Sequence, residues 1–221
     1  MSEQQRIDAA IAEQTTATRR RYDRILWLLI LAHLPLTMGL VPLGYGTWGF
    51  AAAGSLLLGA IATAAWFTLA GTRTFGVVAA ILLMGLSAVM IQSQLGRIEM
   101  HFHIFGALAL LLIYRDWLPL VAAAAVIAIH HVVLTYLQLE GVQLGDMPVM
   151  VFSYGCNRGI TALHAAFGVF ETAIPLYYAH LLAGEQYTSD GINAAVRAIE
   201  EDRDLTFSVP GEDSDPTARA F

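Results

Sequence analysis

Histidine is the residue type in this 221-residue chain with the clearest capacity for chemistry. Five of its seven histidines fall in apolar segments between residues 98 and 182: His101, His103, His130, His131 and His164. A titratable side chain inside an apolar segment costs energy, so each of these five calls for a reason. Neutral imidazole is the commonest metal ligand in proteins. The pattern therefore predicts a transition-metal site, provided that helices bring these side chains together.

Helical geometry limits which of these side chains can share one site. Glu99 and His103 lie one turn apart on the same face. His101 and His103 point in directions about 200° apart, and His130 and His131 differ by about 100°. At most one residue of each histidine pair can therefore face a given site directly.

The preferred constellation takes one ligand from each of three consecutive helices. Its members are His103, either His130 or His131, and His164, with Glu99 or His101 closing the site at the membrane edge. Glu171 follows His164 by two turns on the same face, where it can hydrogen-bond a ligand histidine or act as a ligand itself.

Imidazole-rich sites with few thiolates suit copper, zinc, iron or nickel. Copper or zinc is favoured here and iron is possible, because the chain has a single cysteine, Cys156. A b-type haem held by two axial histidines is the alternative. Two stacked haems are disfavoured, because His164 and His180 are sixteen residues apart.

The composition indicates a membrane as the solvent of the middle of the chain. The sequence is 57% hydrophobic and 14% charged, and residues 25–183 hold only four arginines and five acids. A net charge of −6 without a basic face argues against a nucleic-acid partner. We expect an all-α, polytopic bundle of about six spans in contact with lipid: Ile25–Leu43, Trp48–Ala70, Phe75–Ile91, Ile98–Tyr114, Trp117–Leu137 and Gly159–Leu182.

Three regions follow from this division: an N-terminal arm at residues 1–24, a membrane domain at 25–183 and a linker at 184–221. Four arginines lie between Arg19 and Arg24, and positive charge favours the cytoplasmic side. We therefore expect a multi-pass protein of the inner (cytoplasmic) membrane with both termini in the cytoplasm. In the turn before Trp117, Asp116 is placed to cap the next helix, and Tyr114 is placed as an interfacial anchor.

The linker begins with an amphipathic helix on the cytoplasmic side. Apolar residues recur at Ile192, Val196 and Ile199, with gaps of four and three residues typical of a coiled-coil seam. Asp204 and Leu205 open a following extended connector. Pro175 removes a backbone hydrogen bond upstream and offers a kink point in the signal path.

The stretch Glu99–Gln138, with the later Leu163–Thr172, resembles the histidine-rich, multi-span sensory region of methyl-accepting chemotaxis proteins. The seam, the Asp204-Leu205-Thr206 element and the acidic turn after it resemble the start of a HAMP linker. The resemblance implies a receptor input module rather than an enzyme. It also implies a homodimer and, if the full-length protein continues past Phe221, a cytoplasmic signalling domain or kinase complex.

Two other functions remain open. A membrane metalloenzyme could use the same histidines, although the H-x-x-x-H boxes of membrane desaturases are absent from the sequence. A metal transporter would need a polar path across the bilayer, and polar residues become sparse in the inner half.

Overall fold

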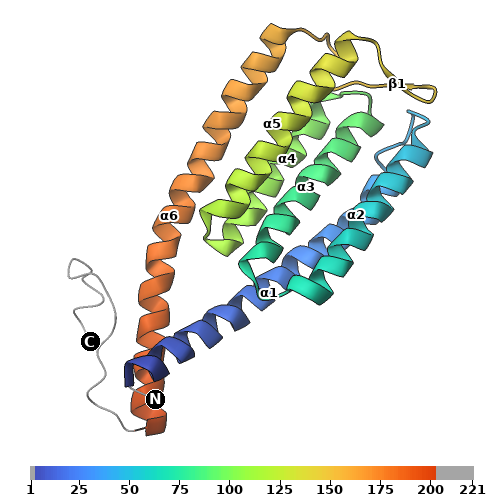
Figure 1. Ribbon diagram of the computed structural model, residues 1–221. Helices are drawn as coiled ribbons and strands as arrows, with labels where there is room; N and C mark the ends of the chain where they lie inside the picture. The colour runs from blue at the N-terminus through green and yellow to red at the C-terminus, as the bar shows by residue number, and fades with distance from the viewer. Residues whose placement is uncertain (1–2, 203–221) are drawn as a thin grey trace.

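The computed structural model describes residues 3–202, which form six α-helices, one short 3-10 helix and a two-stranded hairpin (Figure 1). The helices are α1 (Glu3–Gly39), α2 (Trp48–Leu69), α3 (Arg73–Ser93), α4 (Ile98–Leu111), α5 (Trp117–Leu139) and α6 (Arg158–Asp202), with η1 at Leu112–Tyr114. The antiparallel hairpin pairs β1 (Gln143–Leu144) with β2 (Met147–Pro148). The expected all-α class is confirmed.

Four of these helices are long and apolar enough to cross a membrane, judged by length and composition over residues 3–202. They are α2, α3, α5 and the Arg158–Asn193 part of α6. The segment Ile98–Tyr114 is apolar but shorter, and its fourteen-residue helix α4 rises about 21 Å against a hydrocarbon core of about 30 Å. In α1, a polar arm runs directly into the apolar part that begins at Ile25.

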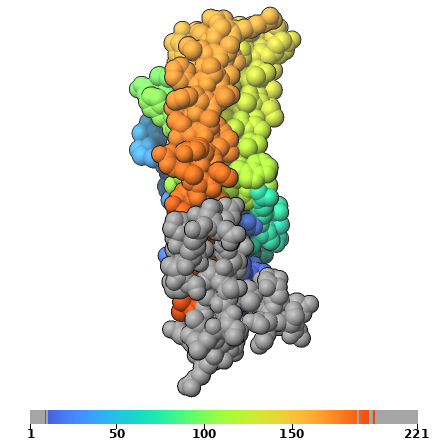
Figure 2. All heavy atoms as spheres, turned by 90° about the vertical axis from the view of Figure 1, so that its left-hand side faces the viewer, coloured from blue at the N-terminus to red at the C-terminus, as the bar shows by residue number. Residues whose placement is uncertain are grey.

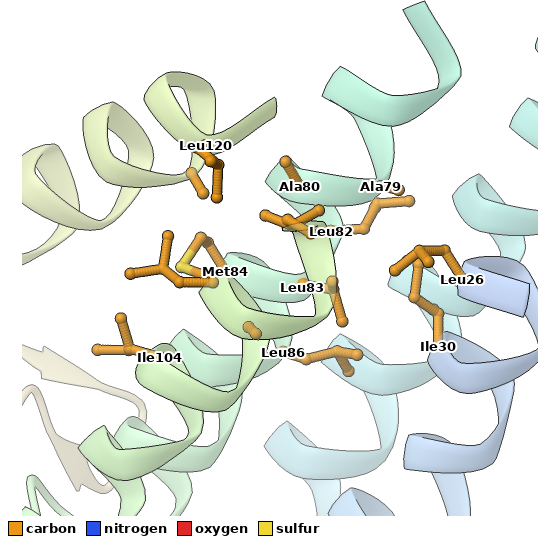
Figure 3. Close-up of a cluster of buried hydrophobic side chains, with 14 of the residues drawn as sticks. Leu26, Ile30, Ala79, Ala80, Leu82, Leu83, Met84, Leu86, Ile104 and Leu120 are labelled. Carbon is orange, nitrogen blue, oxygen red and sulfur yellow. The ribbon is translucent and has the colours of Figure 1, made fainter. Parts of the chain in front are cut away.

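Helix α3 forms the centre of the bundle and contacts α1, α2, α4 and α5. Its side chains interlock with those of its neighbours in one apolar core, where Leu83 and Leu86 are fully buried (Figure 3). Leu26 and Ile30 reach this core from α1, and Leu120 reaches it from α5. Close packing of these buried side chains fixes the relative positions of the first five helices.

The outer surface of the bundle is apolar. On α6, Phe167, Val169 and Phe170 are 58–72% exposed, and Phe67 of α2 is 78% exposed. Figure 2 shows α6 along one face of the molecule with α5 beside it. Large apolar surfaces of this kind are rare on water-soluble monomers, so the surface fits a hydrocarbon environment.

The N-terminal arm and the end of α6 lie side by side at one end of the molecule (Figure 1). The Gln14 amide donates a hydrogen bond of 3.4 Å to Asp190. The arm and the first expected span are one helix, and the last expected span and the seam are also one helix, through Pro175 to Asp202. Asp204 and Leu205 lie outside the described residues.

A buried polar contact joins α1, the α2–α3 turn and η1 at the same end as the arm. Asp23 is fully buried and accepts hydrogen bonds from the Gly71 N–H at 2.6 Å and from the Tyr114 hydroxyl at 2.8 Å. Tyr114 therefore has a partner inside the protein, which the interfacial-anchor prediction did not include. Because a buried carboxylate needs such partners, this contact helps to fix the register of the three segments.

Asp116 forms the N-cap of α5, as predicted. Its side chain accepts a hydrogen bond from the Leu118 N–H at 3.0 Å and two from Arg73, both at 2.6 Å. Burial alone would raise the pKa of Asp116, but the hydrogen bonds from Arg73 and Leu118 outweigh it and lower this pKa. The ionised carboxylate therefore stabilises the folded state.

We expect Asp116→Asn to lower the free energy of unfolding by up to about 1 kcal/mol, because asparagine keeps the cap and loses the ion pair. Asp116→Ala loses both and should cost about 1–2 kcal/mol. Because the folded-state pKa is lowered, the wild-type stabilisation is present above the ordinary aspartate pKa of about 3.9 and is lost as the pH falls through the folded-state value. Thermal unfolding is measured in detergent from about pH 7 to about pH 3. As the pH falls, the unfolding temperature should decrease less for Asp116→Asn than for wild type. Parallel pH curves would contradict this assignment.

Candidate functional site: a three-histidine cluster beside an apolar groove

Three histidines from three different helices meet near one end of the bundle. The ring centroids of His101 (α4) and His131 (α5) are 5.3 Å apart. His164 (α6) lies 5.7 Å from His101 and 6.1 Å from His131. As expected, the histidine-bearing helices converge, and each contributes one histidine to the cluster. Helix α5 contributes His131, and not His130.

The three rings share one hydrogen-bonding pattern. The Nδ1 atoms of His101, His131 and His164 each bond the backbone carbonyl four residues earlier, at 3.2, 2.9 and 3.2 Å. A carbonyl oxygen only accepts, so Nδ1 carries the hydrogen and the neutral ring has its lone pair on Nε2. This backbone bond is the arrangement that orients a metal-binding imidazole.

His101 has an unsatisfied nitrogen. The side chain is 3% exposed, and its Nε2 has no hydrogen-bond partner among residues 3–202. A buried acceptor without a partner costs about 1–3 kcal/mol, so such atoms call for an explanation. In the part of the chain that the structure describes, no three His, Cys, Asp or Glu side chains are arranged to hold a metal ion. The three rings are near each other but do not converge on one point.

Phe152 lies among the three imidazoles. Its fully buried ring has its centroid 4.5 Å from that of His164 and 5.9 Å from those of His101 and His131. Tyr154 follows, and its hydroxyl lies 3.3 Å from Nε2 of His164. The residues after the β1–β2 hairpin therefore fold back into the bundle and form one wall of the cluster.

Two glutamines hold this returning segment by its backbone. On α5, the Gln138 carbonyl accepts from the N–H groups of Val151 and Phe152 at 2.7 and 3.1 Å, and its amide donates to the Phe152 carbonyl at 2.8 Å. On α3, Gln92 bonds the Pro148 carbonyl and the Met150 N–H at 2.8 and 3.0 Å. Neither these glutamines nor Phe152 were predicted from the sequence. Polar glutamines in otherwise apolar spans were the signal that could have found them.

His103 lies on the opposite face of α4. Its Nδ1 is 2.7 Å from the Ser87 hydroxyl, and its ring centroid is 5.0 Å from that of His33 on α1. His103 belonged to the preferred constellation, but the structure does not bring it to His131 and His164. The turn of about 200° between the two histidines of α4 is the reason.

The remaining candidates lie around the cluster. Glu99 forms a paired hydrogen bond with Arg97 at 2.9 and 3.0 Å, and its side chain is 46% exposed. His130 neighbours His131 at 5.2 Å, and its Nδ1 has no partner within residues 3–202. Glu171 is half-buried and lines the cavity next to the cluster.

That cavity is an apolar groove of about 740 Å³ between α4, α5 and α6. His101, His131 and His164 line it, and so does Glu171, two turns beyond His164. Small residues on α5 and α6 leave the space between the helices: Ala124, Ala125, Ala128, Ala165 and Gly168. Phe105 and Leu108 cover it from α4. We refer to it below as the α4–α6 groove.

Comparison with known proteins gives a distant relative. The chain is 30% identical over 141 residues to the "Transducer protein Htr8" of Halobacterium salinarum, an alignment that covers 57% of this chain. It covers 22% of the relative, so the chain matches about a fifth of that protein's length. No protein-family profile matches the chain, and no solved structure matches it. The similarity and the apolar helices together fit the membrane region of a transducer.

Proposed function

We propose that this chain is the membrane-embedded input region of a signal transducer, and that a transition metal bound by His101, His131 and His164 is where the stimulus acts. The observation that carries the proposal is the shared orientation of the three rings, with every Nδ1 bonded to backbone. The similarity to a named transducer supports the signalling role.

The spacing of the rings is close to, but wider than, the spacing that one shared ion requires. Imidazoles bound tetrahedrally at about 2.0–2.1 Å from a zinc ion have ring centroids about 5 Å apart. The observed separations are 5.3, 5.7 and 6.1 Å, slightly wider than this. A ligand set of imidazoles alone favours copper or zinc and allows iron.

A b-type haem, the other cofactor that the sequence left open, fits the cluster less well. The macrocycle needs a wide flat space between two axial imidazoles, whereas Phe152 lies within 5.9 Å of all three rings. An absorption spectrum decides between the two, because a bound haem has a Soret band and a bare ion of zinc or copper has none.

The slight separation of the rings supports a sensing role. Closing three ligands around one ion would draw α4, α5 and α6 together, so the ion would bind the closed arrangement more tightly than the open one. Such a difference in affinity is what allows a ligand to shift a conformational equilibrium. His164 and the seam residues Ile192 and Val196 lie on the same helix, which gives the signal a continuous path.

The further parts of the proposal concern the surroundings of the bundle. Six membrane crossings, with both termini in the cytoplasm, would place the seam of α6 on the cytoplasmic side. A parallel seam of this kind requires a homodimer. The HAMP-like linker would then pass the change to a cytoplasmic signalling domain or a kinase complex.

The test measures metal content and signalling in parallel. Protein purified from membranes is analysed for bound elements and for its absorption spectrum, before and after reconstitution with copper or zinc. Separately, the chain replaces the input region of a characterised transducer, and the output is followed as metal is added. We expect about one ion per chain and a metal-dependent output. Absence of any ion or chromophore after reconstitution would refute the metal, and an unchanged output would refute the sensing role.

The same preparation separates the sensor from the two other functions. Liposomes containing the protein would show metal flux if it were a transporter, and purified protein would show turnover if it were a metalloenzyme. We expect neither flux nor turnover.

A further inference from the structure

The α4–α6 groove combines an apolar body with a polar end, and the groove is not explained by a metal ion. Its volume of about 740 Å³ is far larger than one ion and lies in the range of small-molecule sites, about 300–1,000 Å³. Some of the residues that line the groove also lie on the outer surface of the bundle. These are Phe102, Val132 and Phe167, which are 58–62% exposed. A ligand would therefore enter from the lipid rather than from water.

The polar end of the groove offers hydrogen-bond acceptors. His101 and His131 each donate through Nδ1 to a backbone carbonyl, so the free Nε2 atom of each neutral ring can only accept. The Nε2 atom of His101 has no partner within the described residues and almost no accessible surface, and the residue as a whole is 3% exposed. The His101 ring must therefore turn toward the groove before a ligand can reach this nitrogen. A ligand that satisfies it must carry an O–H or N–H donor.

We infer that the α4–α6 groove binds a lipid-soluble hydroquinone, whose ring hydroxyl donates to Nε2 of His101 and whose alkyl tail lies along Ala128 and Gly168. The oxidised quinone has carbonyl oxygens in place of hydroxyls and cannot donate to this nitrogen. The groove therefore discriminates between the reduced and the oxidised form. A phospholipid matches less well, because its anionic phosphate has no cation among the groove-lining residues.

The inference rests on the proposed function in taking the histidine cluster as the place where the stimulus acts. It names the chemical class of a ligand for that cluster, and this ligand would take the place of the metal, because the hydroxyl occupies the same Nε2 lone pair of His101. Glu171, half-buried in the wall of the groove, gives a second acceptor two turns beyond His164. A hydroquinone carries two hydroxyls, so the ring can be held at one end by the cluster while the tail stays in the apolar part.

The test uses the chelator-treated 221-residue chain in nanodiscs and two probes: 2-decylhydroquinone, kept reduced under anaerobic conditions, and its dimethyl ether. The two probes share the ring and the tail, and only the first has hydroxyl donors. We expect saturable binding of the hydroquinone and at least about tenfold weaker binding of the ether, the loss associated with one hydrogen bond to a buried partner. Equal affinities would mean simple partition into an apolar space and would overturn the inference.

Matched variants locate the site. Ala128→Phe fills the groove, whereas Ala60→Phe places the same ring on the exposed outer face of α2. His101→Phe removes the acceptor, whereas His103→Phe changes the other face of α4. We expect at least about tenfold loss of binding for the first member of each pair and little change for the second. Equal effects within a pair would overturn the assignment.

Two controls keep the outcome clear. The comparison between hydroquinone and ether uses the wild-type protein, so it stands even if a variant fails to fold. If Ala128→Phe changes the oligomeric state, the groove is a subunit interface and the inference is wrong. The measurement uses neither metal nor signalling output, so a failure here leaves the proposed transducer role in place, and a failed signalling test leaves hydroquinone binding measurable.

Discussion

Replacing His101 with asparagine should reduce the affinity for the metal proposed at the cluster at least about a hundredfold. The change removes one of three imidazoles, and a site left with two ligands loses both coordination energy and geometry. Asparagine keeps a polar side chain at this buried position, which limits the effect on folding. The measurement is a competition titration of purified protein against a chelator of known affinity.

His103→Asn is the matched control for this prediction. Both residues lie on α4, two positions apart, and both bond a protein group through Nδ1. His103 faces Ser87 and His33 instead of the cluster, so its replacement should leave the affinity within about threefold of wild type. An equal loss from both variants would mean that folding, rather than ligation, controls metal retention.

Gly96→Ala should produce the largest loss of stability among single substitutions near the cluster. Gly96 joins α3 to α4 with φ +78°, and a Cβ atom there would lie 2.7 Å from the Phe152 nitrogen. The left-handed backbone costs alanine about 1–2 kcal/mol. The clash with backbone, which cannot move aside as a side chain does, adds about 1–3 kcal/mol. We expect a total of about 2–5 kcal/mol, measured as a lower unfolding temperature in detergent.

Gly46→Ala separates the two causes of that loss. Gly46 has φ +71° and nothing within 4 Å of an added Cβ, so it tests the backbone cost without the clash. We expect a loss of about 1–2 kcal/mol there. Equal losses at both positions would show that Phe152 moves away freely and that the segment around it is not held in place.

The helices could be predicted from the sequence, because they depend on the local pattern of apolar and polar residues. Asp116 was predicted for the same reason, since a cap acts within three residues. The rotation of α4 could not be predicted. Whether His101 or His103 faces the cluster depends on how α4 packs against α3, and both residues satisfy the same local pattern.

The position of Phe152 in the wall of the cluster also could not be predicted from the sequence. Its position depends on hydrogen bonds from Gln92 and Gln138 to backbone groups of a segment distant in the chain. Such bonds join two helices and a loop, and no spacing rule connects them. The course of α6 was partly predicted: the path from span to seam was expected, and the structure adds that no turn interrupts it.

The unbroken course of α6 makes it a lever arm. From His164 to Asp202 the helix rises about 57 Å at about 1.5 Å per residue, while its other end is packed against α5. Because the helix is about 57 Å long from His164 to Asp202, a tilt of about 3° near His164 would move its far end sideways by about 3 Å. A small change in the angle of α6 at the cluster would thus become a larger displacement at the Asp202 end of this helix, provided that the helix moves as a rigid rod. Inserting a flexible Gly-Gly pair midway, after Ala183, should leave ligand binding intact and remove that magnification.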